Sequence, residues 1–249
     1  MSVGATAGHK QTPPARGLFV TATDTGVGKT VLAATVLATL RQRGIAAMPL
    51  KPVITGLDEP PDPDWPPDHE LLARAAGSKA AEASLVGYGP PVSPHLAAEL
   101  CGRPIDPESL LAAIRARLAP EKPLIVEGVG GLAVPLAAGF DVRALARALG
   151  LPVLIAARPG LGTINHTLLT LEAARAAGLE VAAVVLTPWP EQPGALERSN
   201  RATIAELGAV AVHTLMRIPR PEPALLARAG ERLPIRDWLS SAGAHAVAG

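Results

Sequence analysis

Short, almost wholly apolar runs recur along the chain and alternate with longer stretches in which apolar positions follow a helical spacing. Runs without intervening polar positions are typical of strands covered on both faces, as in a parallel sheet. The runs that predict strands are residues 18–21, 46–50, 124–127, 153–157 and 181–186. The stretches that predict helices are residues 29–43, 68–76, 107–118, 142–149, 165–177 and 194–207. This alternation predicts an α/β fold with a doubly wound, mainly parallel sheet.

The 249 residues show no internal repeat and no break in composition, so we expect a single domain over residues 17–239. Residues 1–16 lack the apolar core of a signal peptide, and we expect a disordered N-terminal tail there. Residues 240–249 are expected to form a flexible C-terminal tail. The acidic, Pro-rich segment 58–67 favours a solvated loop over the sheet edge, with a metal-attracting lid as the alternative.

The composition narrows the class of partner. Hydrophobic residues make up 48% of the chain, aromatic residues 2%, and the net charge is +1. Few stacking side chains and little net charge argue against nucleic acid, and no apolar run is long enough to span a bilayer. The single cysteine, Cys101, excludes an internal disulfide and fits a reducing, cytoplasmic setting. No histidine pairing supports Cys101 as a nucleophile, so a small apolar filler is favoured.

The segment Thr23-Asp-Thr-Gly-Val-Gly-Lys-Thr30 follows the first predicted strand and precedes a helix, which is the context of a phosphate-binding loop. Gly26 and Gly28 let backbone N–H groups curl round an anion, and Lys29 adds a point charge. The Thr30 hydroxyl is placed to bind Mg²⁺. The usual motif has glycine where this chain has Thr23. An ordinary turn is disfavoured, because a lysine there opposes the helix dipole unless an anion binds.

Polar residues stand where other predicted strands end, and ligands of doubly wound sheets bind at that edge. Lys51 follows the second strand, where a surface charge is the alternative to a cation beside a transferring phosphoryl group. Glu127 ends an apolar run before Gly128, which favours a Mg²⁺ ligand over a capping or surface carboxylate. Asp68 begins a predicted helix, and an N-cap and a metal ligand are equally supported. Thr187 ends the run at 181–186.

Two further segments read as helix starts. Ser93-Pro-His95 has the N-cap and first-position residues of a helix, which is favoured over a substrate-contacting His95. The turn from Leu161 to His166 offers free N–H groups to a carboxylate, with Thr163 as an ordinary cap equally supported. The histidines lack the spacing of metal ligands, so we expect no zinc site.

Taken together, these segments resemble the dethiobiotin synthetase family, which belongs to the P-loop NTPase superfamily. The resemblance rests on residues 20–30, 50–56, 93–95, 126–132 and 161–170, and spans about residues 17 to 220. It implies an ATP- and Mg²⁺-dependent step of biotin biosynthesis. In that reaction, one amine of 7,8-diaminononanoate captures CO₂ as a carbamate, and ATP converts it to a carbamic–phosphoric anhydride. The second amine then closes the ring of dethiobiotin.

The resemblance also implies roles for particular residues. Lys51 and Lys29 would be catalytic, and Thr30, Asp68 and Glu127 would hold Mg²⁺. A homodimer with the substrate site at the subunit interface is implied as well. The expected nucleotide-binding residues are Gly26, Val27, Gly28, Lys29, Thr30, Val31, Glu127, Gly128, Val129, Gly130, Thr187 and Pro188. The expected substrate-binding residues are Thr25, Thr55, Thr163, Ile164 and Asn165.

The chain departs from the family pattern at Ala22 and Val129, where glycine and alanine are usual. Thr187-Pro188 replaces the Asn-Asp pair that reads adenine, which leaves the base preference open. A regulatory ATPase of the partitioning or division-site kind is the main alternative. Those proteins carry a second lysine where this chain has Asp24. An amidotransferase-linked ligase would need a glutaminase domain for which the chain is too short.

Overall fold

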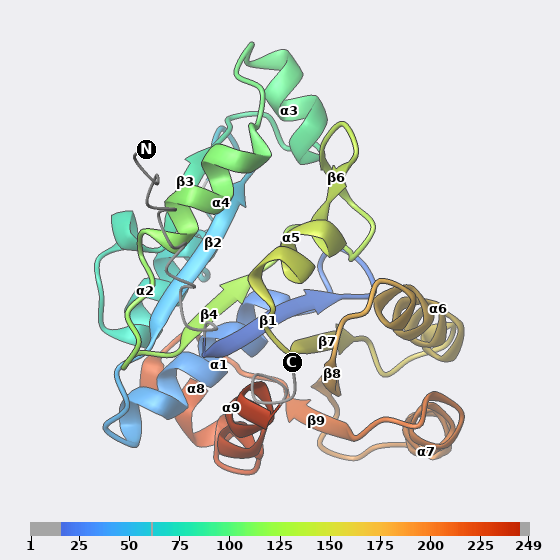
Figure 1. Cartoon of the computed structure of the whole chain (residues 1–249). Coiled ribbons are helices and arrows are strands. Elements are labelled where there is room, and N and C mark those ends of the chain that lie inside the picture. Colours follow the sequence, from blue (N-terminus) through green and yellow to red (C-terminus); the bar gives the residue numbers. More distant parts are fainter. Residues whose placement is uncertain (1–15, 61, 245–249) are drawn as a thin grey trace, which may run out of the picture.

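The computed structural model describes residues 16–60 and 62–244, and within them a seven-stranded sheet forms the centre of the molecule (Figure 1). Its order is β3-β2-β4-β1-β7-β8-β9, and each neighbouring pair is parallel. The predicted tail at residues 1–16 lies almost wholly outside the described residues. The strands are β1 (Gly17–Ala22), β2 (Met48–Ile54), β3 (Ser84–Gly87), β4 (Leu124–Glu127), β7 (Val153–Ala157), β8 (Val181–Trp189) and β9 (Val212–Met216).

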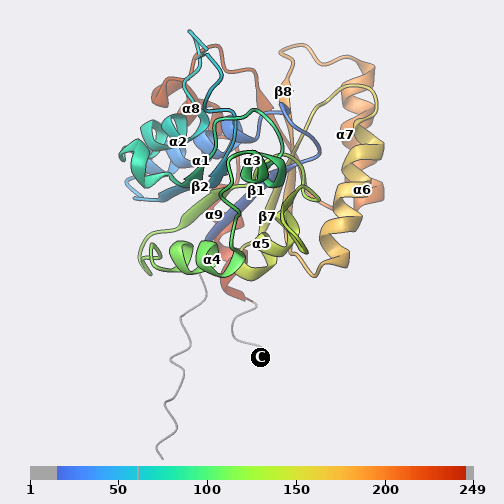
Figure 2. The ribbon, with the colours of Figure 1, turned by 90° about the horizontal axis from the view of Figure 1, so that it is seen from above.

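Helices cover both faces of this sheet. In Figure 2, α1, α2 and α8 gather on one side of the sheet and α6 and α7 on the other. A short hairpin, β5 (Pro135–Ala137) and β6 (Phe140–Asp141), precedes α5. The helices are α1 (Lys29–Gln42), α2 (Asp68–Ala76), the 3₁₀ turn η1 (Ala80–Glu82), α3 (Pro94–Leu100), α4 (Pro107–Arg115), α5 (Val142–Leu149), α6 (Thr163–Ala176), α7 (Ala195–Gly208), α8 (Pro223–Gly230) and α9 (Ile235–Ala244).

Alternate residues of the central strands β1 and β4 enter one of two cores. Phe19 and Val126 pack in the core under α3 to α7, whereas Val20 and Ile125 pack in the core under α1, α2, α8 and α9. These side chains are all fully buried, as two-sided coverage of a parallel sheet requires. The predicted doubly wound, mainly parallel α/β fold is therefore confirmed.

The sequence analysis missed the two edge strands, β3 and β9, the hairpin β5–β6, η1, and helices α8 and α9. The second strand was predicted at residues 46–50, but β2 spans Met48–Ile54, so Lys51 lies within the strand and not after it. Every residue of β3 is partly exposed, so its sequence lacks the apolar run that marks the central strands. Helix α6 begins at Thr163, two positions before the predicted start at Asn165. Helix α9 continues through Ser240 to Ala244, so the predicted flexible tail at 240–249 begins inside a helix, which corrects that boundary.

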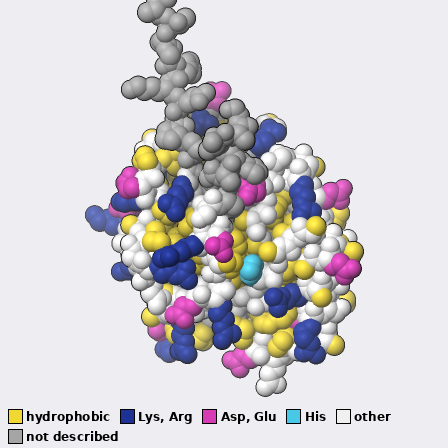
Figure 3. All heavy atoms as spheres, turned by 60° about the horizontal axis from the view of Figure 1, so that its bottom comes forward, with side chains coloured by type: hydrophobic (Ala, Val, Ile, Leu, Met, Phe, Trp, Pro, Cys, Tyr) yellow, Lys and Arg dark blue, Asp and Glu magenta, His cyan; other side chains and the backbone are white. Residues whose placement is uncertain are grey.

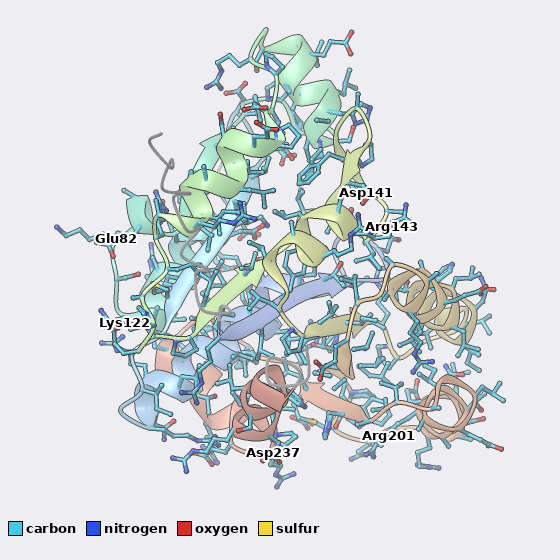
Figure 4. The ribbon with its side chains drawn as sticks, in the orientation of Figure 1. Glu82, Lys122, Asp141, Arg143, Arg201 and Asp237 are labelled. Carbon is cyan, nitrogen blue, oxygen red and sulfur yellow. The ribbon has the colours of Figure 1, made fainter. Side chains whose placement is uncertain are left out.

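Surface charges of both signs are interspersed on the face shown in Figure 3. Local pairs account for several of them. Asp141 accepts a hydrogen bond from the Ala144 N–H at the start of α5, and it also pairs with Arg143 at 2.7 Å (Figure 4). No helix in the described part of the chain is both long and apolar enough to cross a membrane.

His213 on β9 gives the fold a test by pH. Its ring packs edge-on against Trp238 with 5.4 Å between ring centroids. Burial, aided by the Arg201 guanidinium, lowers the pKa of His213 below 6.5. The unfolded chain therefore takes up a proton first as the pH falls, and stability decreases as the pH drops below about 6.5. We expect wild-type protein to lose more unfolding free energy than His213→Gln between about pH 7.5 and about pH 5.5 in thermal denaturation. Equal losses would contradict this account of His213.

Candidate active site

The loop between β1 and α1 has the shape of an anion-binding turn. Gly26 and Gly28 adopt φ values of 68° and 101°, which L side chains rarely tolerate. Helix α1 then begins at Lys29, and no acidic residue lies in its first turn. The free N–H groups and the helix dipole therefore meet at residues 26–30, where they favour an anion.

A buried cluster of opposite charges lies beside this loop. Lys51 on β2 is 5% exposed and Glu127, the last residue of β4, is 1% exposed. The Lys51 ammonium lies 2.8 Å from Glu127 Oε1 and also contacts Asp68 at the first position of α2. Burial of Lys51 and Glu127 shows that the surface-charge alternative for Lys51 and the surface or capping alternative for Glu127 are wrong. The N-cap alternative for Asp68 is wrong as well, because Pro67 is the N-cap of α2.

Thr30 links this cluster to the phosphate loop. Its hydroxyl lies 2.8 Å from Glu127 Oε1 and 3.0 Å from Asp68 Oδ1. Lys29, which is 6% exposed, folds back to donate to the backbone carbonyl of Asp24 at 3.2 Å. One lysine thus lies against the loop and the other lies between two carboxylates.

The charges in the cluster shift one another's titration. Burial lowers the pKa of Lys51, but Glu127 and Asp68 outweigh burial, and the net effect raises the pKa above the ordinary lysine value. For Glu127, burial raises the pKa of the carboxyl although Lys51 opposes it. Burial also raises the pKa of Asp68, but the attraction of Lys51 outweighs burial, and the net effect lowers the pKa of Asp68. Lys51 is therefore held as an ammonium ion.

Lys29 differs from Lys51, because burial lowers its pKa despite the attraction of Glu127. Its carbonyl contact supplies less stabilisation than the two carboxylates give to Lys51. A bound anion at the loop would favour the charged form of Lys29.

The oxygen atoms in this cluster fit a magnesium ion. Glu127 Oε2 is buried and accepts no hydrogen bond, so an acceptor remains available. The described residues hold no group of three or more His, Cys, Asp and Glu side chains suited to a metal. Two carboxylates and a hydroxyl nevertheless suit Mg²⁺, which binds one or two protein carboxylates and completes its shell with water and phosphate oxygens.

Most of the predicted site residues line one cavity of about 980 Å³ at the carboxyl ends of the strands. Glu59, Asp62 and Trp65 of the Pro-rich segment also line it, as does Ser93 before α3. The segment is solvent-exposed at Glu59 and Asp62, and whether it is a metal-attracting lid stays untested. The predicted residues in the lining are Thr25, Gly26, Gly28, Lys29, Thr30, Val31, Lys51, Thr55, Asp68, Glu127, Val129 and Gly130.

Four predicted nucleotide-binding residues lie outside the cavity lining, namely Val27, Gly128, Thr187 and Pro188. Val27 is buried in the core under α1. A Cβ on Gly128 would lie 3.1 Å from both Phe19 and Val142, so glycine permits the packing there. Thr187 is 2% exposed, and its methyl group lies 3.0 Å from the place a Cβ on Gly28 would occupy. The exposed Pro188 follows it in β8.

The turn at the start of α6 also lies outside the lining of this cavity. Gly162 is the N-cap, so the alternative in which Thr163 caps the helix is wrong. Thr163 is buried near the Thr167 hydroxyl, Ile164 packs on the core, and Asn165 is exposed. The structure thus places Thr163, Ile164 and Asn165 outside the lining of the cavity that holds the phosphate loop.

Comparisons with known proteins agree with this geometry. A family model described as an AAA domain matches residues 16–224. The ATP-dependent dethiobiotin synthetase BioD of Haloferax mediterranei is 39% identical over 224 residues, covering 89% of this chain and 93% of that protein. The enzyme of the same name from Mycobacterium avium is 44% identical over 195 residues, covering 78% and 84%.

Among solved structures, apo McdA from Cyanthece matches with a TM-score of 0.52 and 14% identity, over 91% of this chain and 98% of that one. Identity this low shows a likeness of fold alone. The two relatives near 40% identity are matched over 93% and 84% of their own lengths. The chain therefore belongs to the ATP-dependent dethiobiotin synthetase family.

Proposed function

We propose that this protein catalyses the ATP- and Mg²⁺-dependent ring closure of 7,8-diaminononanoate with CO₂, giving dethiobiotin, ADP and phosphate. The observation that carries the proposal is the convergence of Lys51, Glu127 and Asp68 beside the phosphate loop in one cavity. A carbamate and a triphosphate are both anionic, so a site that brings them together must concentrate positive charge.

The phosphate loop would bind the nucleotide. The N–H groups of residues 26–30 and the Lys29 ammonium would hold the phosphates at the start of α1. Thr30, Asp68 and Glu127 would hold Mg²⁺, and the buried, unpartnered Glu127 Oε2 supports this assignment. When bound, the ion supplies charge neutralisation at the phosphate oxygens.

Lys51 would stabilise the carbamate and the transferring phosphoryl group. The amine nitrogen forms a bond to the carbon of CO₂ and loses a proton, which gives the carbamate. A carbamate oxygen then attacks the γ-phosphorus of ATP, and ADP leaves. The second amine attacks the carbonyl carbon of the resulting anhydride, so phosphate leaves and the ring closes. Because its carboxylate partners keep Lys51 protonated, it would serve each step as a cation and not as a base.

Thr25 and Thr55 line the cavity on either side of the cluster and would contact the substrate. The substrate carboxylate would meet the turn at Thr163 to Asn165 from a second copy of the chain in a homodimer. Leu161 beside this turn is 93% exposed, and Leu169 on α6 is 56% exposed, which supports contact with a second copy there. Such a dimer would also explain why α6 begins outside the cavity of its own chain.

The nucleotide base would lie near the end of β8. Thr187 turns its side chain against Gly28 and offers no amide, and Pro188 lacks an N–H. The side chains at this strand end therefore supply less base recognition than an Asn-Asp pair, so base choice must be measured.

Phosphate release tests the proposed reaction. With Mg²⁺, ATP and bicarbonate, we expect phosphate only when 7,8-diaminononanoate is added, together with a cyclic urea detected by mass spectrometry. Parallel reactions with CTP and GTP would measure base choice. Release that is independent of the diamine, without ring product, would contradict the proposal and favour a regulatory ATPase.

Lys51→Ala should lower kcat by about 100-fold or more, because the charge opposite the carbamate and phosphoryl group is lost. Nucleotide affinity should change by less than about threefold, since the phosphate loop is intact. Steady-state kinetics and nucleotide titration measure the two effects. Lys122→Ala is the control, because Lys122 lies before the amino end of β4, whereas the cavity lies at the carboxyl ends of the strands (Figure 4). Wild-type kcat in Lys51→Ala would remove Lys51 from the mechanism.

Glu127→Gln should shift the magnesium titration of activity to higher concentration by about tenfold, because one anionic ligand becomes neutral. Mn²⁺ binding, followed by electron paramagnetic resonance in the presence of ADP, should weaken in parallel. Glu82 is exposed and does not line the cavity, so Glu82→Gln provides the matched control. A metal titration that is the same in both variants would rule out Glu127 as a ligand.

A further inference from the structure

An arginine outside the cavity lining reaches the back of the phosphate loop. Strands β1 and β7 are parallel neighbours with Ala22 opposite Ala156, so the residues that follow them emerge side by side. Arg158, the residue after β7, places its Nη2 atom 3.4 Å from the Thr25 carbonyl and 3.5 Å from the Gly26 carbonyl. One guanidinium nitrogen thus faces two successive carbonyls of the loop.

The backbone that follows Arg158 is held in place by a buried amide. Asn200 on α7 is 5% exposed and donates through Nδ2 to the carbonyls of Pro159 and Gly160, at 2.9 and 3.0 Å. A buried amide that joins two carbonyls fixes the path of this segment. Arg158 therefore extends from a rigid support to the phosphate loop.

The position of Arg158 is not explained by an ion pair. In the described part of the chain no carboxylate lies within 4.0 Å of its guanidinium. It instead adds positive charge near Lys29 and the N-terminus of α1, where cations repel one another unless an anion binds.

The direction of the loop carbonyls determines the direction of its N–H groups. In a planar trans peptide, the C=O and the N–H of the next residue point in opposite directions. With the Thr25 and Gly26 carbonyls turned toward Arg158, the N–H groups of Gly26 and Val27 point away from it. Gly26 has φ 68°, and a Cβ there would lie 3.6 Å from Arg158 Nη2, so the glycine and the guanidinium fit closely.

We propose that Arg158 is a positioning residue for the phosphate loop, holding the Thr25 and Gly26 carbonyls outward so that the following N–H groups face the nucleotide phosphates. This role rests on the proposed function only in requiring that the loop binds nucleotide. Its effect should be on nucleotide affinity and not on the chemical step.

Titration of Mg·ATP into wild-type and Arg158→Ala protein tests the role. We expect affinity to fall about three- to tenfold, because a charged hydrogen bond in an exposed position contributes less than a buried one. At saturating ATP, kcat should stay within about twofold of wild type. Methylguanidinium at millimolar concentration should restore affinity in Arg158→Ala but leave wild type unchanged. Arg158→Lys should fall between the two, because a lysine keeps the charge but not the fork.

Arg175→Ala is the matched control, because Arg175 also donates through Nη2 to two successive carbonyls, Gly208 and Ala209, at the far end of α6. This variant should bind Mg·ATP as wild type does. Asn200→Ala should weaken Mg·ATP binding in the same direction as Arg158→Ala, with less than additive effects in the double variant.

Unchanged affinity in Arg158→Ala would overturn the proposal, as would a fall in kcat with unchanged affinity, which would mean direct contact with the reacting group. The titration of Mg·ATP is carried out without the diamine. A wild-type protein that binds Mg·ATP but forms no ring product would therefore refute the proposed reaction and still test Arg158. A wild-type protein that binds no Mg·ATP would overturn both.

Discussion

The buried ammonium of Lys51 is the interaction on which the site depends. A lysine that is 5% exposed in the middle of β2 would cost several kcal/mol if it were unpaired, so the fold must bring carboxylates to it. Glu127 comes from β4 and Asp68 from α2, and Thr30 of α1 hydrogen-bonds to both. Four separate elements are thus fixed at one point, and this point lies beside the phosphate loop.

The same arrangement sets what each lysine does. The carboxylates around Lys51 raise its pKa, so it acts as a fixed positive charge, whereas burial lowers the pKa of Lys29. In the proposed reaction, phosphate binding would supply the negative charge that Lys29 lacks, and Mg²⁺ would share Glu127 and Asp68 with Lys51. In the proposed reaction, a metal cation and a nucleotide anion would bind at the same cluster, so binding of one would favour binding of the other.

The central sheet and most of the cavity could be predicted because their signals are local. Continuous apolar runs marked the central strands, and Glu127 lies where β4 ends, as predicted. Lys51 lies within β2, because that strand continues to Ile54 beyond its predicted end at residue 50. The edge strands β3 and β9 were missed because exposed positions interrupt their patterns. The contacts from Asn200 to Pro159 and from Arg158 to Thr25 join residues 41 and 133 positions apart, and no local pattern encodes them.

The charge in the cavity also explains why one chain would be insufficient for the proposed substrate. Among the described residues that line it, Lys29 and Lys51 are the cations, and in the proposed reaction phosphate and carbamate would engage both. Glu59 and Asp62 at the cavity wall are acidic, which suits amines and repels a carboxylate. In the proposed homodimer, the substrate carboxylate would then be bound from outside this chain's cavity. An exposed helix N-terminus such as that of α6, presented by a second copy, has the required polarity.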